Sequence, residues 1–181
     1  MTILAIDFGG TQVKFALVSE EFALEKSLPT RSSPQTLNQT LDVIDYLVTS
    51  VKVALTGIAI SVPGTVDTDE GVIYHGGLLR FFHGFRIKDI LEAKYHLPVT
   101  ALNDGKAAAL GELAMGHLQG VTNGAALVLG SGLGGGLIIN GKLFQGSHFQ
   151  AAELTFLLPV QMEKVNPSQM RGTALSAVGF I

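Results

Sequence analysis

The sequence predicts an α/β fold, because apolar runs of strand length alternate with segments of helical period along most of the chain. A strand, a glycine turn and a second strand occur within residues 3–28 and again within residues 125–140. This repetition is what a duplicated nucleotide-binding fold would show. Glycine supplies 22 of the 181 residues, and its densest cluster, at 130–136, indicates specific turns, since the usual glycine share is only about 7%.

The first half of the chain contains a strand meander before its first helix. The expected elements are strands 3–6, 13–18 and 22–28, a helix at 36–52, a strand at 53–62 and a hairpin at 65–74. The helix follows Pro34 and has one apolar stripe, made of Leu37, Leu41, Ile44, Leu47, Val48 and Val51. Pro63-Gly64 ends the buried strand, and Asp69-Glu70-Gly71 forms the turn of the hairpin.

The second half continues with alternating helices and strands. The expected elements are a helix at 87–95, a strand at 98–102, a helix from Asp104 to about His117, and strands at 125–129, 137–140 and 142–144. Asp104 is a good N-cap, and Gly111 and Gly116 would permit close packing of its helix. Asn140-Gly141 is a strong hairpin turn, so the last two strands are expected to pair antiparallel.

Composition and charge exclude several classes of protein. The net charge of −3 argues against a nucleic-acid partner, which needs a basic face. The absence of cysteine excludes disulfides and a thiolate zinc site, and is typical of a reducing cytosol. The N-terminus lacks the pattern of a signal peptide, and the apolar stretch 53–62 is far shorter than the roughly 20 residues of a membrane span. We therefore expect a soluble, cytoplasmic protein with no membrane or nucleic-acid partner.

The first glycine turn, Asp7-Phe-Gly9-Gly10-Thr11, lies between two expected strands. Successive backbone N–H groups in such a turn can form a nest for phosphate oxygens, and Thr11 adds a hydroxyl. Asp7, at the end of the strand, could hold Mg²⁺ through its water shell. The alternative, equally weighted on this segment alone, is an ordinary β-hairpin with glycine at positive φ.

The second glycine cluster also spells the G-x-G-x-x-G pattern of dinucleotide-binding proteins at residues 130–135. That fingerprint requires the glycines to open a helix, whereas here they lead into a strand and the Asn140-Gly141 turn. Glu153 stands near the distance expected of a ribose-binding acid, so a Rossmann domain stays open as a minor alternative. The P-loop pattern G-x-x-x-x-G-K-[ST] does not occur.

Asn103 and Asp104 lie where a strand gives way to a helix, the position at which α/β sheets present ligands. Asp104 could accept a proton from a substrate hydroxyl that Asn103 orients. The helix N-terminus would keep this carboxylate a weak base, which suffices for a loose phosphoryl-transfer transition state. The alternative is that Asp104 merely caps the helix. Glu153 could bind sugar hydroxyls or be an exposed acid of a helix or loop.

Four segments along most of the chain form a specific combination. They are Asp7-Phe-Gly-Gly-Thr11, Ser61-Val-Pro-Gly64-Thr-Val-Asp67, Leu102-Asn103-Asp104 with Ala107-Ala-Ala-Leu-Gly-Glu112, and Gly130-Ser-Gly132-Leu-Gly-Gly-Gly136. Together they resemble the ROK family of repressors, uncharacterised reading frames and sugar kinases, of bacterial glucokinase type. In that family the first and last segments bind phosphate, the second lies near the sugar, and the aspartate of the third is the catalytic base.

The resemblance implies an actin-like ATPase (ribonuclease H-like) fold, with a complete N-terminal domain at 1–106 and the beginning of a second domain at 107–181. It implies an ATP- and Mg²⁺-dependent kinase acting on a hexose or glucoside hydroxyl. Asp104 is implied as the catalytic base, with capping as a compatible second role. The implied substrate-binding residues are Gly64, Asn103, Asp104 and Glu153. The implied ATP-binding residues are Asp7, Gly9, Gly10, Thr11, Ser131, Gly132 and Gly134, with Asp7 also as a Mg²⁺ ligand.

Two departures from the family pattern favour a zinc-free subgroup. The family often has Gly-Glu-Ile-Gly-His where this chain has Ala152-Glu153-Leu-Thr-Phe156, and phenylalanine cannot replace the histidine's contact to sugar or metal. The family's cysteine-rich zinc loop is also absent. Because some kinases of this kind act on β-glucosides, a disaccharide substrate is one expectation.

Length is a third departure. A full family member continues well beyond residue 181, so the chain is expected to be a fragment or a truncated product. An incomplete second domain would leave apolar surface uncovered and favour self-association, such as a homodimer. The main alternative to a kinase is a non-catalytic sugar-binding or regulatory remnant, and a dinucleotide-dependent oxidoreductase is a weaker one. A repressor is not expected, because the family's DNA-binding segment would precede the first motif, which here begins at residue 7.

Overall fold

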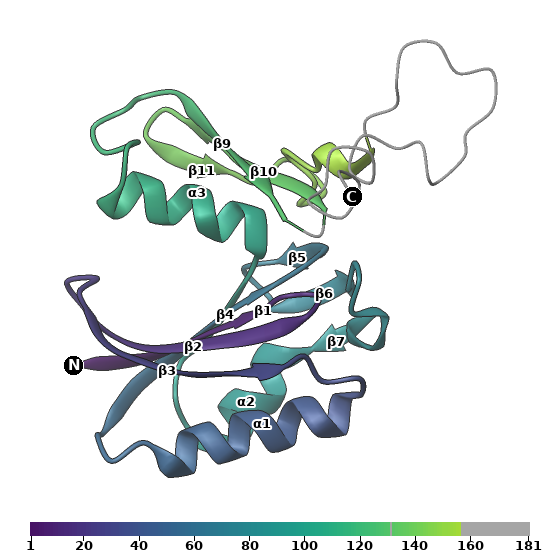
Figure 1. Cartoon of the computed structure of the whole chain (residues 1–181). Helices are drawn as coiled ribbons and strands as arrows, with labels where there is room; N and C mark the ends of the chain where they lie inside the picture. The colour runs from purple at the N-terminus through teal and green to yellow at the C-terminus, as the bar shows by residue number, and fades with distance from the viewer. Residues whose placement is uncertain (131, 157–181) are drawn as a thin grey trace. The chain divides into compact units, whose positions relative to one another are not determined.

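The computed structural model describes residues 1–130 and 132–156 (Figure 1). The chain divides into two compact units, which meet at Asn103 and Asp104. This division falls three residues before the expected domain boundary between 106 and 107. Each unit has its own sheet and is described separately.

The first unit is built on a five-stranded mixed sheet with the order β3-β2-β1-β4-β8. Its strands are β1 (Thr2–Phe8), β2 (Gln12–Ser19), β3 (Leu24–Ser32), β4 (Leu55–Val62) and β8 (Val99–Asn103). The first three strands pair antiparallel, while β4 runs parallel to both β1 and β8. The expected meander and the two later strands are confirmed.

Two helices lie on one face of this sheet, α1 (Leu37–Ser50) and α2 (Ile87–Tyr95) (Figure 1). The Gln39 N–H donates to the Thr36 hydroxyl at 3.2 Å, so Thr36 is the N-cap of α1. The expected stripe of α1 faces the sheet, with Ile44 and Leu47 buried. Burying each such side chain contributes roughly 1.5–3 kcal/mol.

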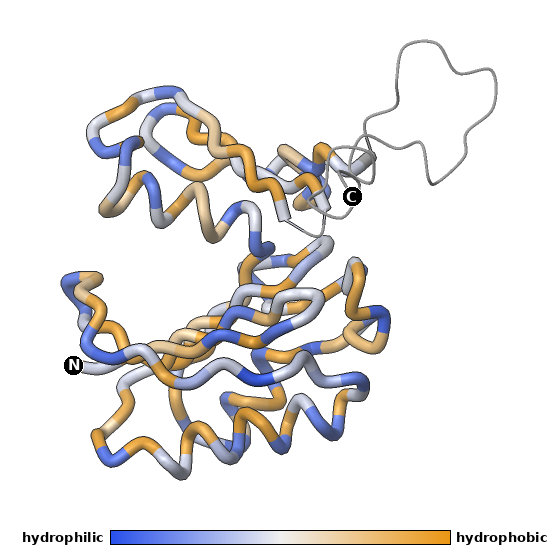
Figure 2. Tube along the Cα trace, in the orientation of Figure 1, coloured by the Kyte–Doolittle hydropathy of each residue, from blue (hydrophilic) through white to orange (hydrophobic). Residues whose placement is uncertain are grey.

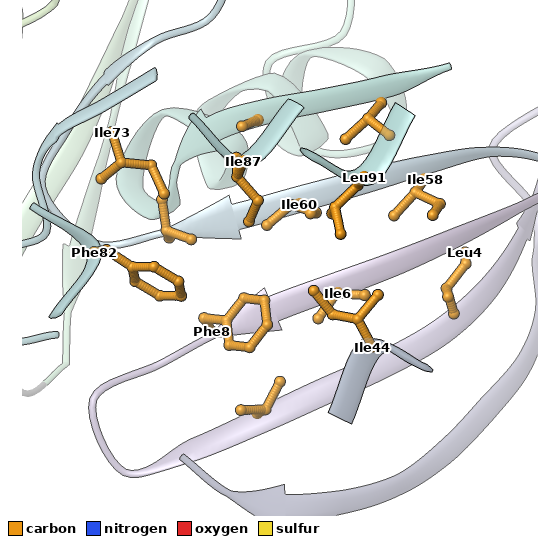
Figure 3. Close-up of a cluster of buried hydrophobic side chains, with 14 of the residues drawn as sticks. Leu4, Ile6, Phe8, Ile44, Ile58, Ile60, Ile73, Phe82, Ile87 and Leu91 are labelled. Atoms are coloured by element: carbon orange, nitrogen blue, oxygen red, sulfur yellow. The ribbon is translucent and has the colours of Figure 1, made fainter. Parts of the chain in front are cut away.

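The core of the first unit joins both helices to the strands (Figure 3). Aliphatic side chains from β1 and β4 fill the space beneath Ile44 of α1 and Leu91 of α2. Phe8 of β1 meets Phe82 edge to face, with ring centroids 5.5 Å apart. The core therefore lies directly under the β1 end that carries Asp7.

A small second sheet, in the order β5-β6-β7, follows β4. Its elements are β5 (Thr65–Asp67), β6 (Val72–His75), the short 3₁₀ helix η1 (Arg80–Phe82) and β7 (Phe85–Arg86). The expected hairpin at 65–74 is confirmed. Its turn is held by the Asp67 carboxylate, which accepts the backbone N–H groups of Asp69 and Glu70 at 3.1 and 3.0 Å.

The second unit packs one helix on a three-stranded antiparallel sheet with the order β11-β10-β9. The elements are α3 (Asp104–Met115), β9 (Gly124–Leu129), β10 (Leu133–Ile139), β11 (Lys142–Phe144) and the 3₁₀ helix η2 (Leu154–Phe156). The Asn140-Gly141 turn is confirmed, and both residues have positive φ, 54° and 71°. In Figure 2 strand β9 is hydrophobic along most of its length, although Leu127 and Leu129 are 69% and 64% exposed.

The glycine cluster differs from expectation, because β10 begins at Leu133 and not at 137. Gly134, Gly135 and Gly136 are strand residues that pair with Val128, Leu127 and Ala126. The physical reason is the close approach of α3: a Cβ placed on Gly136 would lie 2.5 Å from the Cβ of Ala109. Of the described glycines in the cluster, only Gly130 and Gly132 lie outside the strand.

The glycine that lets α3 pack closely is also not the expected one. A Cβ on Gly105 would lie 2.5 Å from the amide nitrogen of Gly135, whereas a Cβ on Gly111 would meet nothing within 4 Å. At Gly116 it would meet the side chain of Glu112, on the same helix. Gly111 and Gly116 were therefore the wrong candidates, since β10 approaches α3 closely at Gly105 and Ala109. Among the residues that the structure describes, no helix has the length and hydropathy of a membrane span.

Candidate active site

Asp7 occupies the end of β1 and is held from two neighbouring strands. The Ser61 hydroxyl of β4 donates to Asp7 Oδ1 at 2.5 Å, and Lys14 Nζ of β2 lies 3.9 Å from Asp7 Oδ2. The Asp7 side chain is still 43% exposed. A single oriented and accessible carboxylate fits the way Mg²⁺ is usually bound beside phosphates, through one or two carboxylates and several waters.

The first glycine turn closes on itself. The Gly9 N–H donates to the Gln12 carbonyl at 3.0 Å, and the Ser33 hydroxyl donates to the Gly9 carbonyl at 2.6 Å. Strands β1 and β2 do form a hairpin around this turn, but neither Gly9 nor Gly10 has a positive φ, so only the left-handed glycine of that alternative is wrong. Glycine is needed at position 9 for space, because a Cβ there would lie 2.9 Å from the Gln12 carbonyl oxygen. Gly10 and the exposed Thr11 remain the predicted phosphate donors.

Two predicted sugar-binding residues lie in direct contact in the first unit. Asn103 is 4% exposed at the end of β8, and its Nδ2 donates to the Gly64 carbonyl at 2.9 Å. Gly64 has φ +96°, and a Cβ there would lie 1.9 Å from the His75 carbonyl oxygen. The turn after β4 can therefore hold only glycine, and its carbonyl fixes the amide of Asn103.

Asp104 is the first residue of α3, one position later than the N-cap that the sequence suggested. Its Oδ1 accepts the N–H of Gly105 at 2.8 Å, so the carboxylate still interacts with the helix N-terminus. This position follows directly on Asn103 in the chain. Asn103 is the last residue of the first unit and Asp104 the first residue of the second, so a single peptide bond joins them.

Glu153 is partly buried in the turn before η2, so the alternative of an exposed acid is wrong. Burial raises the pKa of its carboxyl to about 7, with Lys106 opposing that rise and the negative charge of Asp104 adding to it. A carboxyl with a pKa near neutrality is common at functional sites.

Lys106 is a candidate functional residue that the sequence analysis did not identify. Its side chain is 0% exposed, and Nζ donates to the Phe149 carbonyl at 2.5 Å. Burial lowers the pKa of this lysine, while Glu153 and Asp104 raise it. The sequence did contain one indication that this lysine is unusual. Lys106 is the only charged residue between Asp104 and Glu112 in an alanine-rich helix.

The second glycine turn is short and precedes a strand. The Gly130 N–H donates to the Gly132 carbonyl at 3.0 Å. Gly132 lies in this turn, Gly134 lies in β10, and Ser131 lies outside the described residues. The strand that follows contradicts the Rossmann alternative, which needs a helix here. In the described parts of the chain no three His, Cys, Asp or Glu side chains cluster as metal ligands do.

The meander joined to parallel strands, followed by a second unit of helix and sheet, defines the class of protein. It is the actin-like ATPase (ribonuclease H-like) fold, which solved structures of ROK sugar kinases similar to this chain also have. The chain belongs to the ROK family, whose pattern matches residues 3–165. Both the expected fold and the expected family are confirmed.

Two kinds of relative support this assignment. The chain is 36% identical over 165 residues to a β-glucoside kinase of Listeria monocytogenes, which covers 87% of this chain and 53% of the relative. A ROK family protein of Streptococcus pneumoniae, solved with sucrose, is 35% identical with a TM-score of 0.79, over 93% of this chain and 57% of that one. A ROK family glucokinase of Streptomyces griseus, solved with glucose and AMPPNP, is 30% identical with a TM-score of 0.80, over 88% and 51%. The chain spans about half the length of the curated relatives it matches.

Proposed function

We propose that the protein is an ATP-dependent sugar kinase that phosphorylates a hydroxyl group of a hexose or glucoside. The observation that carries this proposal is the interaction of three ionisable groups in the second unit: Asp104 and Lys106, in the first turn of α3, both act on the partly buried carboxyl of Glu153. Kinases of this family share the fold, and the names of the relatives support the reaction class.

Asp104 is the proposed base. The sugar oxygen attacks the γ-phosphorus of ATP, the bond from that phosphorus to ADP breaks, and the hydroxyl proton passes to the Asp104 carboxylate. Asn103 orients the hydroxyl, and its own position is set by the Gly64 carbonyl. Glu153 accepts a hydrogen bond from a second hydroxyl. Positioning dominates this reaction, because phosphoryl transfer has a loose transition state.

The nucleotide is proposed to lie along the two glycine turns. Gly10 and Thr11 would donate to phosphate oxygens from the first turn, with Gly9 shaping it, and Ser131, Gly132 and Gly134 would serve from the second. Asp7, oriented by Ser61, would hold Mg²⁺ through its waters. The ion would neutralise charge on the phosphates.

The substrate is proposed to be a β-glucoside or a disaccharide, with glucose as the simpler alternative. The β-glucoside kinase from Listeria and the sucrose bound to the Streptococcus protein both favour a substrate larger than one hexose. We place the protein in the cytoplasm, where ATP is available. A homodimer is proposed from the exposed apolar side chains of β9, Leu127 and Leu129.

The test measures ADP release and sugar binding by the 181-residue chain with a panel of glucose, cellobiose and an aryl β-glucoside. Asp104→Asn is expected to lower kcat by roughly 10²–10⁴-fold, the usual contribution of a general base, while sugar affinity changes little. Full activity of this variant would remove Asp104 from the role. Sugar binding without turnover or nucleotide binding by the unmodified chain would instead favour a non-catalytic sugar-binding protein.

A further inference from the structure

The loop that carries Glu153 is tied to α3 by a buried lysine. Lys106 Nζ donates to the Phe149 carbonyl at 2.5 Å, four residues before Glu153. The loop is itself tightly wound, since the Ala151 N–H donates to the Gln145 carbonyl at 3.1 Å and both Phe149 and Ala152 have positive φ, 57° and 61°. Such a conformation is costly for residues other than glycine and persists only where contacts hold it.

The same lysine is the only cation that acts on Glu153 in the described part of the second unit. Asp104 and Lys106 of α3 are the charged groups that influence its carboxyl. The strands β9 and β10 carry no ionisable side chain. The remaining ionisable groups of the described second unit, Glu112, His117, Lys142 and His148, do not contribute. The charged groups around this position are therefore two carboxylates, Asp104 and Glu153, and one ammonium, Lys106.

Stability alone does not account for a lysine in this place. Removing an ammonium from water costs several kcal/mol, and an apolar side chain of similar volume would usually serve a core as well or better. Methionine would fill the same space without that cost. The buried charge therefore indicates a role in the site.

We propose that Lys106 is a positioning residue of the sugar site, which anchors the 145–153 loop, and Glu153 with it, to the first turn of α3. This proposal rests on the proposed function, in which Glu153 accepts a hydrogen bond from the sugar. An ionised carboxylate accepts such a bond more strongly than a neutral acid. Lys106 also opposes the rise in the pKa of Glu153, which is about 7. Loss of the lysine charge would therefore change Glu153 at pH 7 from about half ionised to mostly protonated, and the sugar would bind well only at higher pH.

The experiment compares Lys106→Met, Lys106→Gln and Lys106→Arg with the matched control Lys142→Met, an exposed lysine of β11. The titration of the Glu153 carboxyl is followed by ¹³C NMR in the 181-residue chain, and sugar affinity is measured by calorimetry from pH 6 to 9. In both neutral variants the Glu153 midpoint is expected to rise from about 7 by one unit or more. Sugar affinity at pH 7 should fall about fivefold or more, since the ionised share of Glu153 falls from about one half to about one tenth, and it should recover at pH 9. Lys106→Arg should restore both, and Lys142→Met should change neither.

A Glu153 midpoint that does not move in a folded neutral variant would overturn the proposal, and two such variants are included in case one fails to fold. A midpoint that moves while the pH profile of sugar affinity stays unchanged would overturn the role in the sugar site. If the midpoint moves but the unmodified chain binds no sugar at any pH, the proposed function fails and the coupling of Lys106 to Glu153 stands.

Discussion

The Ser61 hydroxyl donates to Asp7 Oδ1 at 2.5 Å, across the parallel pair of β1 and β4. The two residues stand opposite one another in the register, so the bond follows from the pairing of the strands. The other carboxylate oxygen of Asp7, Oδ2, lies 3.9 Å from Lys14 Nζ. Asp7 therefore has one oxygen fixed by a neutral donor and one beside an exposed cation.

Ser61→Ala is expected to weaken Mg²⁺-dependent nucleotide binding by roughly 10–100-fold, the usual cost of losing a group that orients a metal ligand. Calorimetric titration with ATP, with and without Mg²⁺, measures the effect. Thr56→Ala is the matched control, because its hydroxyl bonds to the Thr2 carbonyl on the same pair of strands. Equal losses in both variants would show that Ser61 acts only on the fold.

Glu153→Gln is expected to stabilise the protein at pH 8 and to leave it unchanged at pH 4. The carboxyl has a folded pKa of about 7 against an ordinary value of 4.5, so folding favours its protonated form. Stability is then fully present below pH 4.5 and is lost as pH rises through 7. Thermal unfolding should show a Tm difference that grows from near zero at pH 4 to roughly 2–4 °C or more at pH 8. A constant difference at all pH values would contradict the assignment.

Leu91→Ala is expected to lower the free energy of unfolding of the first unit by about 2–5 kcal/mol, since it leaves a cavity between α2 and the sheet. Its neighbour Ile90 is 38% exposed, whereas Leu91 is fully buried. Ile90→Ala should therefore cost less than about 1 kcal/mol. Urea denaturation of the two variants measures both values, and similar losses would mean that α2 is packed differently.

Gly105→Ala and Gly111→Ala are expected to change stability in opposite directions, although both lie in α3. At Gly105 the added Cβ would press on the Gly135 amide nitrogen and push the helix away from β10, at a cost of roughly 1–3 kcal/mol. At Gly111 the space is open, and alanine should stabilise the helix by about 0.5–1 kcal/mol. Thermal unfolding of both variants tests this, and destabilisation by Gly111→Ala would contradict it.

The sequence was sufficient for most elements of the fold, because helical and strand periods are local properties. The apolar stripe of α1 and the turn at Asn140-Gly141 both appear as expected. The start of β10 could not be predicted, because glycine has a low strand propensity and Gly134–Gly136 form a strand only through packing against α3. The fold class and the family could also be predicted, because the four motifs together resemble those of one known family.

The candidate site was only partly predictable, for a similar reason. The bond from Asn103 to Gly64 joins two residues that were already candidates from their motifs. Lys106 was missed because a lysine in a helix is normally solvated, and its burial depends on a loop that begins some 40 residues later. The raised pKa of Glu153 depends on the same burial, which no local pattern records.

The contact between α3 and β10 also restricts which amino acids can occupy the positions that form it. Every amino acid other than glycine carries a Cβ, so any missense change in the codons of Gly105 or Gly136 introduces an atom for which there is no room. Such positions can change only together with a shift of the facing strand, which a single mutation does not supply. In a library of all single variants we expect both codons to be depleted of every substitution, while the Gly111 codon, on the same helix, accepts many.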